Sequence, residues 1–141
     1  VIYTPRAELL GNADFVSIHV PYEPATEKLA DAAFFAAMKK GAYYINTSRG
    51  PVQEEHALFE ALTRGHLAAA GLDVFEQEPA PTDNPIFNLP NVVCSAHVAG
   101  VTREASRTAY IQVAGEMLRV LRGEKPDVLV NPAVWPRLGQ R

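Results

Sequence analysis

The chain has 141 residues, which is enough for one domain of ordinary size with a buried core. Apolar residues make up 48% of it and charged residues 21%, close to the average for soluble globular proteins, so extensive disorder is excluded. The net charge is -3 without a basic block, and no apolar run reaches the ~18 residues of a membrane span, so neither a nucleic acid nor a membrane is indicated as a partner.

Strand-like and helix-like patterns alternate along the chain. The strand-like runs are short, apolar and rich in β-branched and aromatic residues, as is typical of parallel strands buried on both faces. The alternation predicts an α/β fold with a mostly parallel sheet, followed by a tail over residues 125–141 that is expected to be extended. In chain order the predicted elements are a strand at residues 15–20, a helix at 32–39 capped by Asp31, a strand at 43–47, a helix at 54–64, a strand at 70–74, a loop at 76–91, a strand at 92–97 and a helix at 102–121.

Cys94 is the only cysteine, so a disulfide within the chain is excluded. Its apolar neighbours Val92 and Val93 predict a strand, in which a cysteine acts as a small apolar residue. This use of cysteine favours a reducing, cytoplasmic location.

Charged side chains follow the predicted strands at the edge where open parallel sheets bind ligands. Arg49 follows the second strand, and its planar guanidinium suits a small carboxylate, although it could equally pair with an acidic neighbour at the surface. Glu78 follows the third strand and His97 ends the fourth. A carboxylate beside a histidine fixes the ring and supports proton transfer; the alternative is a capping histidine and a solvated glutamate.

Asp73 ends an apolar strand, where a buried carboxylate needs partners. It could accept a hydrogen bond from an amide such as the carboxamide of a nicotinamide, or cap the following turn. His19 is expected to be a core histidine, and His56 and His66 to be solvated. The histidines and acids show no metal-ligand spacing, so no metal is predicted.

Five stretches resemble the D-isomer-specific 2-hydroxyacid dehydrogenases, a family that includes phosphoglycerate, glyoxylate/hydroxypyruvate and D-lactate dehydrogenases. The resemblance covers residues 7–135, and the order of five motifs makes it specific. The chain departs from the family pattern at Ala96, where Pro is frequent, and at Gln53 and Glu54, where Val-Asp is frequent. The stretches are ADFVSIHVPYEPATEKL, MKKGAYYINTSRGPV, GHLAAAGLDVFEQEP, LPNVVCSAHVAGVT and LVNPAVW.

The resemblance implies a Rossmann-like fold, namely the C-terminal half of a doubly wound NAD-binding domain over residues 1–124, with residues 125–141 as a tail that returns to a substrate domain. The expected reaction is hydride transfer between NAD(H), with NADP not excluded, and a small D-2-hydroxy or 2-oxo acid. Full-length relatives are expected to be homodimers. No Gly-x-Gly-x-x-Gly turn for the cofactor diphosphate is present, so the isolated chain is expected to be inactive. A truncated product or a non-enzymatic cofactor-binding module is the alternative.

The resemblance also assigns roles to individual residues. Arg49 would bind and activate the substrate, and His97 would be the acid and base, held by Glu78. Cofactor contacts are implied for Val20, Pro21, Thr47, Ser48, Arg49, Asp73, His97, Ala99 and Gly100.

Overall fold

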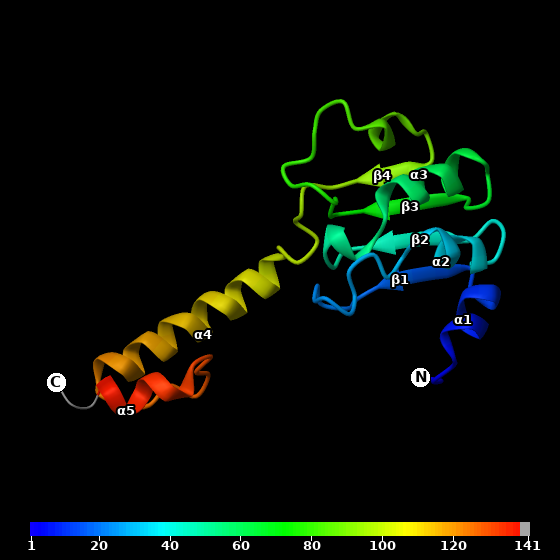
Figure 1. Ribbon diagram of the computed structural model, residues 1–141. Helices are drawn as coiled ribbons and strands as arrows, with labels where there is room; N and C mark the ends of the chain where they lie inside the picture. Colours follow the sequence, from blue (N-terminus) through cyan, green and yellow to red (C-terminus); the bar gives the residue numbers. More distant parts are fainter. Residues whose placement is uncertain (139–141) are drawn as a thin grey trace. The chain divides into compact units, whose positions relative to one another are not determined.

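A four-stranded parallel sheet forms the centre of the fold in a computed structural model that describes residues 1–138 (Figure 1). The strands lie in the order β1-β2-β3-β4, with Phe15 opposite Tyr43 in the first pair. The predicted α/β class and parallel sheet are therefore confirmed. The strands are β1 (Phe15–Ile18), β2 (Tyr43–Asn46), β3 (Ala69–Leu72) and β4 (Val92–Cys94).

Each strand ends one to three residues before its predicted end, because strand pairing stops where the polar turns begin. The predicted strand at residues 92–97, for example, pairs only as far as Cys94. The remaining residues of that run, including His97, form a turn. Most of the predicted site residues thus lie on turns that leave the carboxyl edge of the sheet.

Short helices cover one face of the sheet: α2 (Ala32–Ala37) and α3 (Glu55–Thr63) lie over it in Figure 1, and α1 (Arg6–Asn12) contacts α2. Asp31 caps α2 as predicted, since its carboxylate accepts a hydrogen bond from the Phe34 N–H at 2.8 Å. α1 was not predicted from the sequence. Only Leu10 of this helix is buried, so its sequence pattern is weak.

The core lies between these helices and the sheet. Tyr44 is fully buried at its centre, with edge-to-face contacts to Phe34 and Phe35 at centroid distances of 6.4 and 5.1 Å. Each such aromatic pair stabilises the fold by about 0.5–1.5 kcal/mol beyond the contribution of the buried surface area.

In the part of the chain that the structure describes, side chains on the opposite face of the sheet are exposed, whereas the sequence predicted strands buried on both faces. Phe15 is 66% exposed and Tyr43 42%, and their rings stack on each other at 4.7 Å. Val93 on β4 is 76% exposed. Apolar content alone did not distinguish a strand covered on both faces from one covered on a single face.

The chain divides into two compact units, residues 1–99 and 100–141. The second unit contains α4 (Arg103–Leu121), whose N-cap Thr102 accepts a hydrogen bond from the Ala105 N–H at 3.1 Å. Part of the predicted extended tail is helical, in η3 (Pro132–Val134) and α5 (Trp135–Leu138), and residues 139–141 lie outside the described residues. The predicted division of the chain at residue 124 stays a prediction.

Two further 3-10 turns lie in the first unit, η1 (Gly50–Val52) and η2 (Pro85–Asn88). The second interrupts the predicted loop over residues 76–91. Within residues 1–138, no helix is long and apolar enough to cross a membrane.

Candidate active site

The turn that carries Arg49 is built on a buried asparagine at the end of β2. Asn46 is 0% exposed. Its Oδ1 accepts hydrogen bonds from the backbone N–H and the hydroxyl of Ser48, each at 2.9 Å. Its Nδ2 donates to the Arg49 carbonyl at 3.2 Å and to Gln53 Oε1 at 3.0 Å. Because asparagine readily bonds the backbone two residues ahead, it stabilises a sharp turn here. Arg49 is exposed on this turn, and its Nη1 donates to the Ser48 carbonyl at 2.7 Å.

Gly50 brings this turn against the chain segment that leads to Glu78. A Cβ atom at position 50 would lie 1.7 Å from the carbonyl oxygen of Phe75 and 2.7 Å from the backbone nitrogen of Glu76. Only glycine permits such an approach of two backbones. The glycine of the Ser-Arg-Gly sequence therefore sets how closely the turns after β2 and β3 pack.

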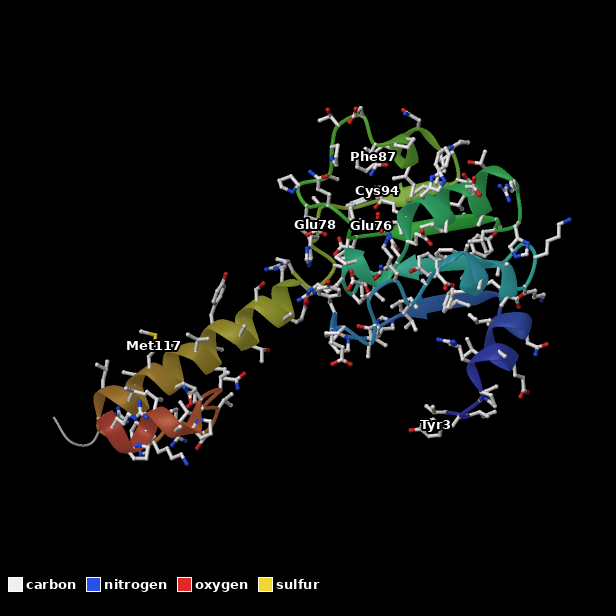
Figure 2. All side chains as sticks on the ribbon, in the orientation of Figure 1. Tyr3, Glu76, Glu78, Phe87, Cys94 and Met117 are labelled. Atoms are coloured by element: carbon white, nitrogen blue, oxygen red, sulfur yellow. The ribbon has the colours of Figure 1, made fainter. Side chains whose placement is uncertain are left out.

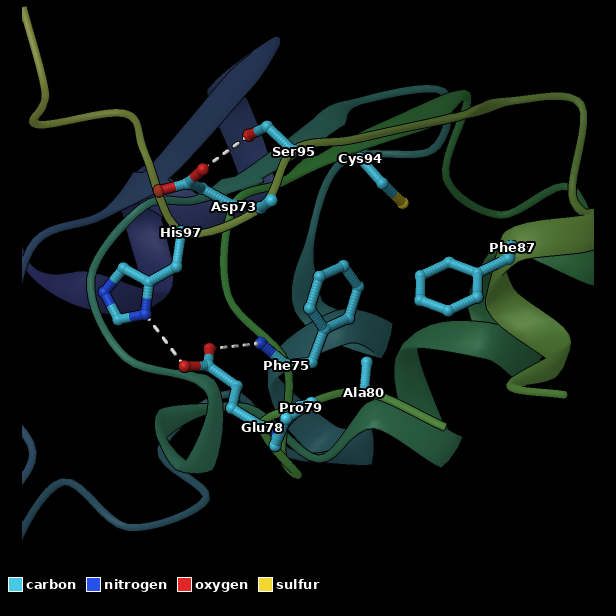
Figure 3. A pocket seen from close by; sticks show the side chains of 10 residues that line it. Asp73, Phe75, Glu78, Pro79, Ala80, Phe87, Cys94, Ser95 and His97 are labelled. Carbon is cyan, nitrogen blue, oxygen red and sulfur yellow. Dashed lines mark hydrogen bonds and ion pairs between the residues drawn. The ribbon is translucent and has the colours of Figure 1, made fainter. Parts of the chain in front are cut away.

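Glu78 and His97 form the hydrogen-bonded pair that the sequence predicted. Glu78 Oε2 lies 2.8 Å from His97 Nδ1, and its Oε1 accepts from the Phe75 N–H at 3.1 Å (Figure 3). Burial tends to raise the pKa of Glu78, but these hydrogen bonds and the charges of His97 and Arg49 outweigh burial and hold the pKa below its ordinary value. The carboxylate is therefore ionised at neutral pH and can only accept, so Nδ1 carries the proton. Nε2 is left as the ring nitrogen that can exchange a proton with a ligand.

His97 stands in a left-handed backbone conformation, with φ at 55°. This conformation is uncommon outside glycine, although histidine adopts it more often than most residues. Asp73 holds the turn: its carbonyl accepts the His97 N–H at 2.9 Å, and its carboxylate accepts the N–H groups of Val98 and Ala99, each at 2.9 Å. The hydroxyl of Ser95 also donates to this carboxylate, at 2.5 Å.

Asp73 is only 3% exposed, and its carboxylate caps the turn after β4 rather than the turn that follows Asp73 in the chain, so the sequence indicated a cap but not its place. Burial tends to raise its pKa, but the hydrogen bonds from Ser95, Ala99 and Val98 and the charge of His97 outweigh burial and lower the pKa below its ordinary value. Its own N–H donates to the Asn46 carbonyl at 3.0 Å, which links the two turns.

Two hollows lie at this edge of the first unit. The first has a volume of about 610 Å³ and brings together most of the residues predicted to bind the cofactor. It also includes His19, which is exposed and bonded to the Ser17 hydroxyl at 2.8 Å, so the prediction of a core histidine was wrong. The lining residues are His19, Val20, Pro21, Tyr22, Thr47, Ser48 and Arg49.

The second hollow, of about 720 Å³, lies beside the Glu78–His97 pair (Figure 3). Phe75 and Phe87 meet edge to face in its wall at 5.2 Å, and neither was predicted from the sequence as a lining residue. Cys94, labelled in Figure 2, lies in β4 as predicted, but it lines this hollow and is exposed, so it does not fill the core as a small apolar residue. In Figure 3, the nitrogen of His97 that is not bonded to Glu78 points away from the two phenylalanines.

Ala99 and Gly100 were both predicted to contact the cofactor. Ala99 takes part in the turn after β4 through its N–H, and Gly100 is the first residue of the second unit. His66 was predicted to be solvated; instead it is half-buried, and its Nε2 lies 3.0 Å from the Met38 carbonyl.

A parallel α/β sheet with polar turns at its carboxyl edge is the architecture of Rossmann-like nucleotide-binding domains. Residues 1–99 match the profile of the D-isomer specific 2-hydroxyacid dehydrogenase, NAD binding domain. The chain therefore belongs to the D-isomer specific 2-hydroxyacid dehydrogenase family, which confirms the resemblance found in the sequence.

Individual relatives agree with this assignment. The chain is 43% identical over 134 residues to the glyoxylate reductase of Korarchaeum cryptofilum (strain OPF8), a match that covers 95% of this chain and 40% of that protein. The NAD-complexed D-isomer specific 2-hydroxyacid dehydrogenase of Lactobacillus delbrueckii ssp. bulgaricus superposes with a TM-score of 0.85 at 32% identity, over 92% of this chain and 43% of that one.

A third relative is the D-isomer specific 2-hydroxyacid dehydrogenase of Xanthobacter autotrophicus Py2 in complex with NADPH and MES. It superposes with a TM-score of 0.74 at 37% identity, over 90% of this chain and 52% of that one. The chain spans about two fifths of the length of the glyoxylate and glyoxylate/hydroxypyruvate reductases that it matches.

Proposed function

We propose that this chain supplies the catalytic residues of an NAD-dependent dehydrogenase that interconverts a small 2-oxo acid and the D-2-hydroxy acid. The observation that carries the proposal is the 2.8 Å contact between Glu78 and His97 Nδ1, which leaves Nε2 free at the edge of the sheet where Arg49 also lies. A histidine that is held by a carboxylate at one ring nitrogen can give and take a proton at the other. The family membership and the named activities of the relatives support the same reaction.

In this proposal, Arg49 binds the carboxylate of the acid with two parallel hydrogen bonds and polarises the neighbouring carbonyl. His97, in its charged form, donates the Nε2 proton to the carbonyl oxygen as reduction proceeds. Glu78 accepts from Nδ1 and stabilises the charged ring through their hydrogen bond. In the oxidative direction, neutral His97 takes the hydroxyl proton at the same nitrogen.

The hollow beside Arg49 fits the nicotinamide side of a dinucleotide. It combines the hydroxyls of Thr47 and Ser48 with a guanidinium, at the carboxyl edge where such sheets bind nucleotides. When bound, the cofactor supplies or accepts the hydride. The residues assigned to it are Val20 and Pro21 near the adenosine part, Thr47, Ser48 and Arg49 on the nicotinamide side, Asp73 toward the carboxamide, and His97, Ala99 and Gly100 over the ring.

NAD is the proposed cofactor, and NADP stays open because one similar solved structure holds NAD and another NADPH. The proposed complete protein is a cytoplasmic homodimer, in line with the family resemblance and the unpaired Cys94. A module that only senses the cofactor would not need the Glu78–His97 pair, so the enzyme is the favoured function.

The test is a reductase assay on the complete protein that contains this chain. NADH or NADPH oxidation is followed with glyoxylate, hydroxypyruvate or phosphohydroxypyruvate, and the hydroxypyruvate product is examined for the D isomer. We expect turnover with at least one acid, and loss of turnover in His97→Asn, which keeps a residue that tolerates the left-handed backbone. Absence of turnover with all three acids and both cofactors, or full turnover in His97→Asn, would contradict the proposal.

A further inference from the structure

A buried pair of amide side chains, Asn46 and Gln53, lies beneath the turn that carries Arg49. Both are 0% exposed. Buried amides need hydrogen-bond partners, and all four bonding positions of Asn46 are used. Every one of these bonds goes to the segment between Ser48 and Gln53. The side chain of Asn46 is therefore fitted to this one turn.

The bonds lead from Asn46 to the guanidinium in two steps. Asn46 Oδ1 accepts from the N–H and the hydroxyl of Ser48, which fixes the position of that residue. The carbonyl of Ser48 in turn accepts a hydrogen bond from Arg49 Nη1 at 2.7 Å. Asn46 also donates to the carbonyl of Arg49 itself at 3.2 Å. The backbone and the head group of Arg49 are thus both held by groups that Asn46 places.

Gln53 anchors the far end of the turn. Its Oε1 is the acceptor for the second Nδ2 hydrogen of Asn46, at 3.0 Å. Its backbone is paired with Ala30 in an isolated parallel bridge, and its N–H bonds to the Gly50 carbonyl at 3.0 Å. The resemblance found in the sequence places Val frequently at this position; in this chain Gln53 supplies the acceptor that completes the bonding of Asn46.

We propose that Asn46 and Gln53 are positioning residues that act on the substrate through Arg49. The proposal rests on the proposed function, in which Arg49 binds the carboxylate of the acid. Removing either amide leaves the guanidinium present but less well placed. The KM for the 2-oxo acid then rises more than kcat falls, because the lost interaction binds substrate and transition state alike.

A double-mutant cycle in the complete protein tests this mechanism. Asn46→Ala should raise the KM for glyoxylate by about tenfold in the wild-type background and leave it unchanged in the Arg49→Ala background, because residues that act as a unit are not additive. Gln53→Leu is the second variant, to be used if Asn46→Ala fails to fold. It places an apolar side chain of similar size in the buried position, removes the acceptor for Asn46, and should give the same pattern with a smaller effect. Equal fold-changes in both backgrounds would overturn the proposal.

Leu10→Ala is the matched control. Leu10 is a buried core residue of α1, outside the Arg49 turn, and its truncation loosens the same unit. It should lower stability without a selective rise in the KM for the acid. A selective rise in this variant would show that general loosening explains the effect, and would contradict the positioning role.

A second readout separates this proposal from the proposed function. If Arg49→Ala leaves the KM unchanged, the proposed role of Arg49 in substrate binding is wrong. The NMR resonance of the Arg49 Nε–H group then tests whether Asn46 and Gln53 position Arg49, independently of substrate binding. In the wild-type chain that resonance should be sharp and displaced from the position of a free arginine; in Gln53→Leu it should move toward the free position. An unchanged resonance in Gln53→Leu and Asn46→Ala would overturn the positioning role itself.

Discussion

Gly50 lies so close to Phe75 that a methyl group at position 50 would meet the Phe75 carbonyl oxygen at 1.7 Å. The contact joins the turn of Arg49 to the segment before Glu78. We predict that Gly50→Ala destabilises the chain by about 1–3 kcal/mol, the usual cost of overpacking, because the backbone on one side must shift. Urea unfolding measures this change.

Gly11 provides the matched control for this prediction. It lies in α1 of the same unit, and nothing lies within 4 Å of a Cβ added there. Gly11→Ala should leave stability unchanged or raise it by about 0.5–1 kcal/mol, as alanine does in helices. Equal destabilisation by both substitutions would show that the close contact at Gly50 does not carry the effect.

Asp73 should make stability depend on acid pH. Its pKa is lowered in the folded chain, so its ionised form stabilises the fold above the ordinary carboxyl pKa, and this contribution is lost as the pH falls through the lower folded value. Asp73→Asn should cost roughly 1.5–3 kcal/mol at neutral pH, because Val98 and Ala99 donate to different carboxylate oxygens and the amide nitrogen that replaces one of them cannot accept.

Urea unfolding at a series of pH values below about 4 provides the measurement, since the ordinary aspartate pKa is 3.8. The loss of stability with falling pH should be smaller in Asp73→Asn than in the wild-type chain. An identical slope in both proteins would mean that Asp73 is not the group responsible.

Glu78→Gln should slow reduction. The glutamine keeps the size of the side chain but lacks the negative charge that stabilises the charged ring of His97. We expect kcat to fall by about 100-fold, the lower end of what a positioned acid contributes. Steady-state kinetics of the complete protein measure this, and an unchanged kcat would show that the charge of Glu78 does not support the reaction.

Cys94 should react slowly with thiol reagents although it is exposed. Partial burial of the thiol and the negative charge of Glu55 raise the pKa of Cys94, so little thiolate is present at neutral pH. We expect slower labelling by iodoacetamide than of a free cysteine, and faster labelling in Glu55→Gln. Rapid labelling in the wild-type chain would contradict this.

Much of the fold could be predicted from the sequence, because short apolar runs and capped helices mark parallel α/β units. Asp31 and Thr102 are local caps, and their helices begin where the sequence indicates. The contact between Glu78 and His97 also follows from a general rule, since parallel strands deliver their carboxyl ends to one edge. The strand ends were harder to predict from the sequence, because strand pairing decides where they fall. The helix α1 was harder to predict because few of its residues are buried.

The remaining features depend on which groups meet in space. Nothing in the sequence shows that Gly50 contacts Phe75, or that both carboxylate oxygens of Asp73 are occupied by the turn after β4. Cys94 and His19 have apolar neighbours in sequence, yet both are exposed, because exposure depends on the packing of other elements. The catalytic and cofactor-binding roles stay predictions until the assays are done.

The hydrogen bond between the Asp73 N–H and the Asn46 carbonyl has a geometric consequence. The turns that bear Arg49 and His97 are both anchored at this contact between β2 and β3, and paired strands stand at a fixed spacing of about 4.8 Å. The spacing of the two strands therefore sets the distance between the points where the two turns are anchored. Variation in loop length or side-chain size can change the surroundings of Arg49 and His97, while the separation between the anchors of the two turns stays constant.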